Sequence, residues 1–456
     1  MPIERLLVAN RGEIAVRILR AAESLGIATV QAVSKADRDM LAARLADEVV
    51  EIGPAQATKS YLRPELLIEA AKKTGADAIH PGYGFLSENA DFAEAVEAAG
   101  LIFVGPSADT IRKMGDKATA RAIAAAAGVP TVPGSDGRVE GLAEALKVAE
   151  AIGWPVMIKA AAGGGGRGIR VARDAAELAE QIPQATLEAT TAFGDGGLYL
   201  ERFIGRARHI EVQILGDGTR SVHLFERECS LQRRRQKVWE EAPAACLAPE
   251  TRAALCASAV RLAESVGYRG AGTLEYLWDE ATGEFFFIEM NTRIQVEHPV
   301  TEMITGVDLV AEQIRVAGGA PLSLDQAAIG LTGHAIECRI NAEDASRDFA
   351  PSPGVVTALS VPAAAHVRFD SHLYEGYAVP PFYDSLLGKL IVHGSSRDEA
   401  RARMAAALAD LKVEGVATTI PLHRALAADA GVAAHDVHTR WLEGWLADHP
   451  IVPADA

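Results

Sequence analysis

The chain has 456 residues, a formal net charge of −16, and 49% hydrophobic against 23% charged residues. This composition is typical of a folded globular protein, and the length predicts roughly two to four subdomains. The acidic balance argues against general nucleic-acid binding, which needs a basic surface. No apolar run approaches membrane-spanning length and the N-terminus has no signal-peptide core, so we expect no membrane association. The four cysteines form no CxxC pair, which disfavours a zinc site and favours a reducing, cytoplasmic location.

The first part of the chain predicts a parallel sheet. An apolar strand at 5–9 is followed by an amphipathic helix and by a second strand at 27–33. Strands and helices continue to alternate up to residue 104, so residues 1–105 are predicted to form a doubly wound α/β domain. No GxGxxG follows the first strand, so a dinucleotide site is not predicted.

The loop at 80–88, His-Pro-Gly-Tyr-Gly-Phe-Leu-Ser-Glu, follows a parallel strand at its carboxyl end. Ligands of open α/β sheets bind outside those ends, and glycines allow close backbone approach. The alternative is an ordinary turn with buried aromatic side chains. We favour a binding loop.

A second unit follows a helical, alanine-rich stretch. Residues 155–159 form a predicted strand ending in Lys159, and the glycine-rich run at 160–168 leads into another strand at 169–172. This order differs from a P-loop, in which a helix follows the glycines. Glycine backbone N–H groups can nevertheless surround phosphate oxygens. A flexible loop without a ligand is the alternative, but the adjacent lysine favours a mobile, phosphate-binding flap.

Polar side chains recur on the next strands. Glu201 lies in a predicted strand at 198–204, and His209 lies in another at 208–215, where a structural histidine is the alternative. The segment 230–237 carries four cations in eight residues, which indicates a local anion site in an acidic protein. Its alternative is a solvated basic loop.

The segment 289–297, Glu-Met-Asn-Thr-Arg-Ile-Gln-Val-Glu, alternates polar and mostly apolar residues. In an extended strand the polar residues share one face. A preceding strand carries Glu275, so a hairpin would place this carboxylate near Glu289 and Asn291. Such oxygen ligands suit Mg²⁺, and the alternative is a strand with one solvated face.

The remaining chain predicts a long helix at 300–318, a strand at 333–340 carrying Arg339, short strands within 354–394, and closing helices at 397–427 and 436–446. The glycine flap, the carboxylate hairpin and the basic cluster together predict ATP-dependent phosphoryl transfer onto a small anion. Glu297 is positioned to act as a general base. Arg293 and Lys237 are suited to hold a planar anion.

Several motifs resemble those of biotin carboxylases, a family with the ATP-grasp fold. They are Asn10-Arg-Gly-Glu13, the loop 80–89, Met114-Gly-Asp-Lys117, Gly163-Gly-Gly-Gly-Arg-Gly168, the segment 289–299 and Arg339-Ile-Asn-Ala-Glu343. The resemblance covers nearly the whole chain. It implies a pre-ATP-grasp domain at 1–105, a helical linker at 106–130, a lid with the glycine flap at 131–203, and a C-terminal α+β domain at 204–456.

The resemblance also implies site residues. The expected ATP-binding residues are Lys117, Lys159, Gly165, Gly166, Glu201, Ile204, His209, Gln232, Arg235, Leu277, Glu275 and Glu289. Mg²⁺ or Mn²⁺, with two ions expected, would bind Glu275, Glu289 and Asn291. Bicarbonate would bind Lys237, Arg293, Gln295 and Val296, and biotin would lie near Tyr83, Arg339 and Asp384. Arg235 stands where many members carry His or Asn.

The implied reaction is carboxylation of biotin through carboxyphosphate. Glu297 would deprotonate bicarbonate, and Arg339 would stabilise the biotin enolate. The chain shows no Met-Lys-Met biotinylation segment, so we expect a separate biotin carboxyl carrier protein, carboxyltransferase subunits and a homodimer, most simply in an acetyl-CoA carboxylase. The alternatives are a carboxylase for propionyl-CoA, methylcrotonyl-CoA or pyruvate, another ATP-grasp ligase, and a non-catalytic nucleotide-binding regulator.

Overall fold

The structure is a computed structural model that describes residues 2–139, 141–160, 170–193 and 196–452. The chain divides into two compact units. The first comprises residues 1–129, 208–277 and 289–456, and the second comprises residues 130–207 and 278–288. Each unit is described by itself.

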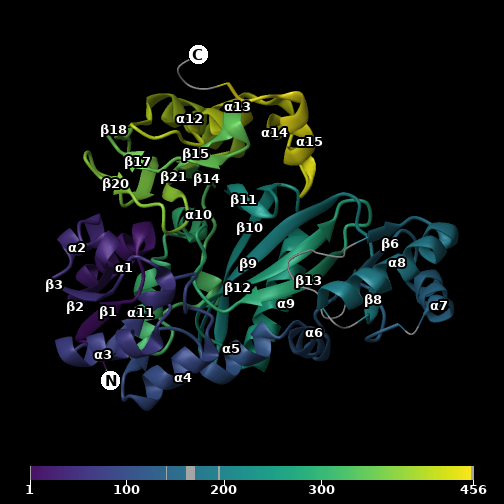
Figure 1. The fold of residues 1–456 in the computed structure, drawn as a ribbon, viewed down its shortest axis with the longest axis horizontal. Coiled ribbons are helices and arrows are strands. Elements are labelled where there is room, and N and C mark those ends of the chain that lie inside the picture. Colours follow the sequence, from purple (N-terminus) through teal and green to yellow (C-terminus); the bar gives the residue numbers. More distant parts are fainter. Residues whose placement is uncertain (1, 140, 161–169, 194–195, 453–456) are drawn as a thin grey trace. The chain divides into compact units, whose positions relative to one another are not determined.

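A parallel sheet begins the first unit, with the strand order β3-β2-β1-β4-β5. Figure 1 labels β1, β2 and β3 of this sheet. Its strands are β1 (Arg5–Val8), β2 (Ala28–Ser34), β3 (Glu48–Gly53), β4 (Ala78–His80) and β5 (Ile102–Phe103). Its helices are α1 (Gly12–Ser24), α2 (Leu41–Leu45), α3 (Pro64–Thr74) and α4 (Ala90–Ala98). Leu6 packs with Ile14 of α1 in one core cluster, whereas Leu7 packs with Leu67 of α3 in another. Helices therefore cover both faces, which confirms the predicted doubly wound sheet.

A larger sheet of eight strands has the order β13-β12-β9-β10-β11-β14-β21-β19. Its strands are β9 (Ala207–Asp217), β10 (Ser221–Arg233), β11 (Gln236–Ala242), β12 (Arg269–Asp279), β13 (Phe285–Asn291), β14 (His334–Asn341), β19 (Val367–Ser371) and β21 (Leu386–Gly394). The strand pairings from β9 through to β19 are all antiparallel. Two candidate catalytic residues, Lys237 and Arg339, lie in these strands.

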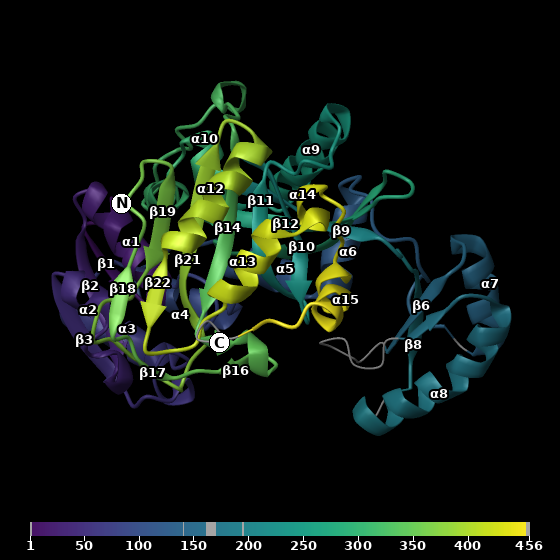
Figure 2. The ribbon, with the colours of Figure 1, turned by 90° about the horizontal axis from the view of Figure 1, so that it is seen from above.

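The first unit contains further helices, several of which contact this sheet. They are α5 (Ala108–Gly115), α6 (Lys117–Ala126), α9 (Pro249–Ser265), α10 (His298–Thr305), α11 (Leu309–Ala317), α12 (Arg397–Asp410), α13 (Ile420–Ala428), α14 (Ala430–Ala433) and α15 (Trp441–Asp448). Figure 2 shows α12 lying along β14 and β21, where Met404 and Leu408 join the same apolar cluster as Cys338 and Leu390. Short strands complete the C-terminal part: β15 (Glu343–Asp344), β16 (Ala350–Pro351), β17 (Gly354–Val355), β18 (Ala358–Ser360), β20 (Ala378–Val379) and β22 (Lys412–Glu414).

The prediction of one continuous helix at 300–318 is wrong, because two helices, α10 and α11, occupy that range. Gly306 ends α10 in the left-handed region at a φ of 72°. Asp308 then caps α11, since its carboxylate accepts a hydrogen bond from the backbone of Ala311. Left-handed glycine and an aspartate cap are standard stop and start signals.

The second unit contains a three-stranded antiparallel sheet in the order β7-β6-β8. Its elements are β6 (Val156–Ala160), β7 (Arg170–Ala172), β8 (Leu198–Arg202), α7 (Leu142–Ile152) and α8 (Ala175–Phe193). Val156 and Leu200 pack with Ala149 and Leu178 in a core of their own. The glycine-rich run at 161–169 lies outside the described residues.

The mixed α/β fold class is confirmed by these sheets. The four predicted domain ranges remain predictions. Among the described residues, no helix has both the length and the apolar character needed to cross a membrane.

Candidate active site

Lys237, near the start of β11, gathers three carboxylates. Its ammonium donates to Glu211 over 2.5 Å, to Glu275 over 2.9 Å and to Glu297 over 2.6 Å. Burial alone lowers the pKa of Lys237, but these three carboxylates outweigh it and raise the pKa well above its usual value. The lysine therefore remains a cation among buried acids. Glu211 was not predicted from the sequence, although it shares one face of β9 with His209.

Arg339 on β14 holds Glu297 from a second direction. Its Nε donates to Glu240 over 2.6 Å and its terminal nitrogen donates to Oε2 of Glu297 over 2.9 Å. Glu297 is therefore held by Lys237 on one oxygen and by Arg339 on the other. The structure brings these three predicted catalytic residues together. Glu240, which links to Arg339, was missed by the sequence interpretation.

Glu297 is 1% exposed and precedes α10 as its N-terminal flanking residue. Burial raises the pKa of its carboxyl, and so does the nearby Glu211. The cations of Lys237, Arg339 and Arg227 act against both and leave the pKa below its usual value. Glu297 is thus ionised at neutral pH and able to accept a proton.

The segment 289–297 differs from its prediction as one extended strand. β13 ends at Asn291, and the chain then turns into α10. The backbone N–H of Thr292 and the guanidinium of Arg293 both donate to Glu88, over 3.1 Å and 2.8 Å. Pro299 lies in the first turn of α10, where proline is common. The alternative of a solvated polar face is excluded by burial, since Asn291 is 8% exposed and Gln295 is 3% exposed.

The proposed metal ligands Glu275, Glu289 and Asn291 lie among polar side chains. Asn291 and Gln295 donate to Oε1 of Glu275 over 3.0 Å and 2.8 Å, so the amide and the carboxylate are neighbours. The half-exposed Glu289 lies 3.6 Å from the ammonium of Lys117 at the start of α6. Carboxylate and amide oxygens are the donors that Mg²⁺ prefers, so this set fits the ion chemically.

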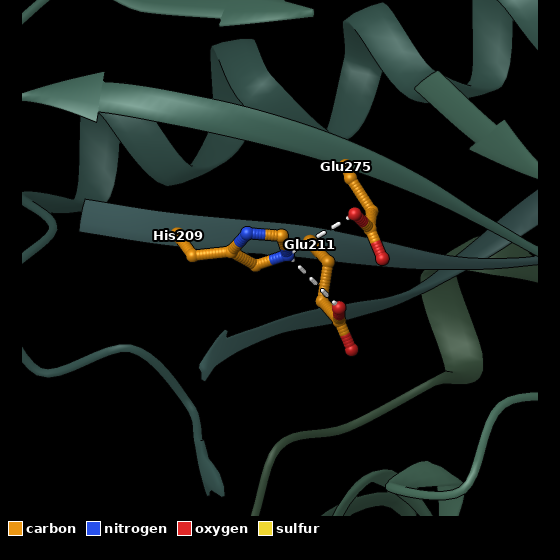
Figure 3. A group of neighbouring side chains, drawn as sticks. All are labelled: His209, Glu211 and Glu275. Carbon is orange, nitrogen blue, oxygen red and sulfur yellow. Dashed lines mark ion pairs between the residues drawn. The ribbon is translucent and has the colours of Figure 1, made fainter. Parts of the chain in front are cut away.

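His209 lies beside two of the buried acids, as Figure 3 shows. Its Nε2 is 3.5 Å from Glu211 and 3.4 Å from Glu275. Burial lowers the pKa of His209, but Glu275 above all raises it to about 9. These three side chains are close enough together to bind a metal ion. With both carboxylates free, the imidazole is held beside them as a cation.

Arg227 on β10 is a site residue that the sequence interpretation missed. It is fully buried and donates to Glu211 over 2.6 Å and to Gln295 over 2.9 Å. It also donates to Gln213, Thr273 and Thr301. Its strand is rich in polar residues, and Arg227 lies between Glu226 and Glu228, so the sequence carries no signal that singles it out. Arg227 orients Glu211, which in turn contacts Lys237.

The basic segment 230–237 is the tip of the β10–β11 hairpin rather than a loop. Arg233 and Arg234 pair with Asp348, over 2.6 Å and 3.1 Å, and Arg235 is exposed. Gln232 donates to the carbonyl of Cys229 over 2.8 Å. The four cations therefore do not form one anion site, and Lys237 alone among them contacts the acids of the site.

The other predicted nucleotide residues occur in both units. In the second unit, Lys159 pairs with Glu201, and Ile204 lines a cavity of about 420 Å³ with the aromatic ring of Trp154. In the first unit, Leu277 lies on β12, two residues beyond Glu275. Gly165 and Gly166 fall outside the described residues. The carbonyl of Val296 accepts a hydrogen bond from Lys389 over 2.7 Å.

Tyr83 and Asp384 both line a cavity of about 110 Å³ in the first unit. The remaining lining residues are Asn10, Arg11, Gly12, Glu13, Gly84, Phe85 and Leu386. The hydroxyl of Tyr83 donates to Glu13, and the amide of Asn10 donates to the carbonyl of Tyr83 over 2.7 Å. The loop at 80–88 is thus held rigidly against the start of α1. Arg339, predicted to share the biotin site, is not among the residues lining this cavity.

Three family models match the chain in order. They are "Biotin carboxylase, N-terminal domain" at residues 2–111, "Carbamoyl-phosphate synthase L chain, ATP binding domain" at 116–325, and "Biotin carboxylase C-terminal domain" at 337–444.

Known proteins resemble the chain over nearly its full length. A biotin carboxylase of Pseudomonas aeruginosa is 54% identical, covering 97% of this chain and 98% of its own. A pyruvate carboxylase subunit of Methanothermobacter thermautotrophicus is 49% identical, covering 96% of this chain and 89% of its own. The biotin carboxylase domain dimer of Hydrogenobacter thermophilus 2-oxoglutarate carboxylase, solved with MgADP, ADP and bicarbonate, is 46% identical with a TM-score of 0.88 and covers all of both chains.

Proposed function

The chain belongs to the biotin carboxylase family, an ATP-grasp family of ligases, and we propose that it carboxylates biotin on a separate carrier protein, using ATP and bicarbonate. The observation that carries this proposal is the position of Glu297. Its two carboxylate oxygens are held by Lys237 and Arg339. A small anion bound by these cations would lie directly against a buried, ionised base.

We assign bicarbonate to this position. Lys237 would supply a point charge, and the planar guanidinium of Arg293 would supply a fork that matches a carboxylate. Gln295 and the backbone of Val296 complete the proposed contacts. Glu297 removes the bicarbonate proton, and the resulting oxygen attacks the γ-phosphorus of ATP. The bond from the γ-phosphorus to ADP breaks as the bond to bicarbonate forms, giving carboxyphosphate and ADP.

We assign the following residues of each unit to nucleotide binding. Lys117, His209, Gln232, Arg235 and Leu277 belong to the first unit. Lys159, Gly165, Gly166, Glu201 and Ile204 belong to the second. Glu275, Glu289 and Asn291 would hold Mg²⁺ or Mn²⁺, and the solved relative that contains MgADP supports magnesium. When bound, the metal offsets negative charge on the phosphates. Two ions are expected.

We assign the second half of the reaction to the neighbourhood of Arg339, Tyr83 and Asp384. Carboxyphosphate breaks down to CO₂ and phosphate, and the phosphate takes the proton from N1 of biotin. The biotin enolate then forms a C–N bond with CO₂. Arg339 stabilises the negative enolate oxygen by charge and by hydrogen bonding.

Acetyl-CoA carboxylase is our proposed physiological context, because the chain covers 98% of the length of two relatives named simply biotin carboxylase. In this context the partners are a biotin carboxyl carrier protein and carboxyltransferase subunits. We further propose a homodimer in the cytoplasm. A second candidate is a keto-acid carboxylase, favoured by the likeness to the pyruvate carboxylase relative and to the 2-oxoglutarate carboxylase domain.

The test is ATP hydrolysis by the purified protein with Mg²⁺, measured without bicarbonate, with bicarbonate, and with bicarbonate plus free biotin. We expect turnover that requires bicarbonate and increases with biotin. Turnover that requires bicarbonate and ignores biotin would indicate another carboxylating ligase. No turnover under any condition would contradict the proposal and favour a nucleotide-binding regulator.

Reconstitution separates the two physiological contexts. The protein is combined with a biotinylated carrier and the carboxyltransferase of either an acetyl-CoA or a pyruvate carboxylase, and incorporation of labelled bicarbonate is measured. Transfer of label to acetyl-CoA alone supports the first context. Transfer to pyruvate alone supports the second.

A further inference from the structure

Two buried acids lie directly opposite each other on neighbouring strands behind Arg339. Glu240 of β11 and Glu337 of β14 are register partners in the antiparallel ladder. Directly opposite residues have Cβ atoms roughly 5 Å apart. Both side chains are 0% exposed. The proposed mechanism uses neither carboxyl group.

The hydrogen bonding of the two acids is very unequal. Glu240 accepts from Nε of Arg339 through Oε1, whereas its Oε2 has no hydrogen-bond partner among the described residues. Within the same described ranges, neither oxygen of Glu337 has a partner. An ionised carboxylate without hydrogen bonds is very unfavourable in a buried site, and the group becomes protonated instead.

The surroundings of the pair favour the neutral form of Glu337. On the same face of the sheet, Ala335 and Ile391 pack with Val300 of α10 in an apolar cluster. Lys389 is the register partner of Arg339. Its ammonium donates a hydrogen bond to the carbonyl of Val296 and forms an ion pair with Glu13 over 3.2 Å. The cation that contacts Glu240 is therefore Arg339 itself.

Burial raises the pKa of both acids. It raises the pKa of Glu337 well above its usual value, although the ammonium of Lys389 opposes this, and proximity to Glu240 adds to the increase. The pKa of Glu240 is raised to about 7 by burial, against the opposing influence of Arg339. The charged or titratable groups that act on the pair are Arg339 and Cys338 of β14, Lys237 of β11, Cys229 of β10, Lys389 of β21 and Glu297 at the start of α10.

We propose that Glu240 is a positioning residue that holds Arg339 against Glu297, and that Glu337 carries a proton which allows Glu240 to remain ionised beside it. The proposal rests on the role assigned above to Arg339 in biotin carboxylation. Ionising two adjacent buried carboxylates has a high free-energy cost because the charges repel each other, and a proton on Glu337 removes this repulsion. Glu240 then fixes one edge of the guanidinium, and the other edge faces the base.

The test compares Glu240→Gln with Glu337→Gln. The second variant is the matched control, because each substitution removes one carboxyl group from the same pair of register partners. We measure kcat and KM for free biotin in bicarbonate-dependent ATP hydrolysis, and MgATP affinity by calorimetry. Glu240→Gln should lower kcat/KM for biotin by about 100-fold, the cost of a misplaced catalytic group, without changing MgATP affinity. Glu337→Gln should remain close to wild type, since an amide replaces an acid that is already neutral.

The pH profile provides a readout that a purely structural role would not change. Below about pH 7 Glu240 becomes protonated and releases Arg339, so kcat/KM for biotin should fall on the acid side in wild type. This decline should be absent from Glu240→Gln and retained in Glu337→Gln. Infrared spectroscopy should show a protonated-carboxyl carbonyl band at neutral pH that Glu337→Gln lacks.

Wild-type kinetics in Glu240→Gln, an equal loss in Glu337→Gln, or an unchanged infrared band in Glu337→Gln would each overturn the proposal. If Glu240→Gln does not fold, Glu240→Asp replaces it, since the shorter carboxylate keeps the charge but cannot reach Arg339 in the same way. Its biotin kcat/KM should then fall, and an unchanged value would refute the positioning role. A wild-type protein without biotin-dependent turnover would instead contradict the proposed function, and the infrared comparison would still test the proton on Glu337.

Discussion

Glu88 and Arg293 lie 205 positions apart in the sequence, and the guanidinium of Arg293 donates to Oε2 of Glu88 over 2.8 Å. The other oxygen of Glu88 accepts from the backbone of Thr292 over 3.1 Å. One carboxylate at the end of the loop at 80–88 therefore fixes both the backbone and the side chain at the point where β13 ends. The contact orients a residue assigned to bicarbonate.

Glu88→Gln should raise the KM for bicarbonate roughly tenfold, because a charge-assisted hydrogen bond to Arg293 is replaced by a neutral one. Stability should change by less than about 1 kcal/mol, since Glu88 is partly exposed and such pairs contribute little. Initial rates at varied bicarbonate and a urea titration measure the two quantities. Glu94→Gln, at an exposed ion pair of α4, is the control and should leave the KM unchanged. An equal rise in both variants would contradict the role of Glu88.

Glu297→Gln should lower bicarbonate-dependent ATP hydrolysis by about 100-fold to 10,000-fold, the usual contribution of a general base. The amide cannot accept the bicarbonate proton. MgATP binding, measured by calorimetry, should persist because Glu297 lies outside the proposed metal set. Glu414→Gln, at an exposed position of β22, is a matched control. Substantial turnover by Glu297→Gln would exclude this residue as the base.

Lys237→Met should raise the pKa of Glu297, because the substitution removes a cation that lowers it. The base of the wild type is ionised above its lowered pKa and becomes inactive as pH falls through that value. The acid limb of the pH profile of bicarbonate-dependent ATP hydrolysis, measured without biotin, should therefore move to higher pH in the variant. Unfolding free energy should also fall, by about 3 kcal/mol, since Glu211 and Glu275 lose a buried partner. An acid limb at the wild-type position would contradict this electrostatic role.

His80 should make the fold sensitive to mild acid. Its Nδ1 accepts from the backbone N–H of Gly82 over 3.0 Å, and burial lowers its pKa from 6.5 to about 3. Between these values the unfolded chain binds a proton that the folded chain does not. Stability therefore falls as pH drops below 6.5, by about 1.4 kcal/mol per pH unit for this group.

The comparison is urea unfolding of wild type and His80→Gln at several pH values from 7.5 to 5. The variant should lose less stability on acidification, whatever its stability at pH 7.5. Parallel curves for wild type and His80→Gln would show that His80 does not couple folding to protons.

A substitution in the turn at Arg234 and Arg235 should increase the stability of the fold. Both residues have positive φ, at 49° and 67°, between the paired residues Arg233 and Gln236. Two-residue hairpin turns of this kind favour Asn and Gly. Arg235→Gly should raise the unfolding free energy by up to about 1 kcal/mol, since the left-handed conformation strains a residue with Cβ. It should also raise the KM for ATP if the proposed nucleotide contact exists.

Urea unfolding and ATP titration measure the two effects of Arg235→Gly separately. Arg20→Gly is a matched control in the interior of α1, where glycine should lower stability by about 1 kcal/mol. A loss of stability in Arg235→Gly similar to that of the control would contradict the strain argument.

The parallel sheet could be predicted because its information is local. Short apolar strands alternate with helices that end at glycines such as Gly26 and Gly75. The hydrophobic periodicity and the positions of the glycines therefore predict the same element boundaries. The break between α10 and α11 was also encoded locally, by Gly306 and Asp308, but the continuous apolar pattern on both sides concealed it.

The geometry of the site depends on contacts that sequence periodicity does not contain. The bend after Asn291 is held by Glu88, more than 200 positions away. Arg233 and Arg234 are neutralised by Asp348, so four neighbouring cations gave a misleading signal of one anion site. Conversely, nothing in the pattern distinguished Arg227 from an ordinary exposed strand residue, although it is fully buried among acids.

The burial of the cluster around Lys237 has a consequence for ionic strength. Dissolved salt screens charges that face water and has little effect on pairs from which water is excluded. Glu211 and Arg227 are fully buried, whereas the excess of negative charge of −16 must be carried mainly by exposed groups. Added salt therefore acts chiefly on repulsion at the acidic surface. The arrangement of Lys237, Glu297 and their buried neighbours is insulated from the electrolyte around the protein.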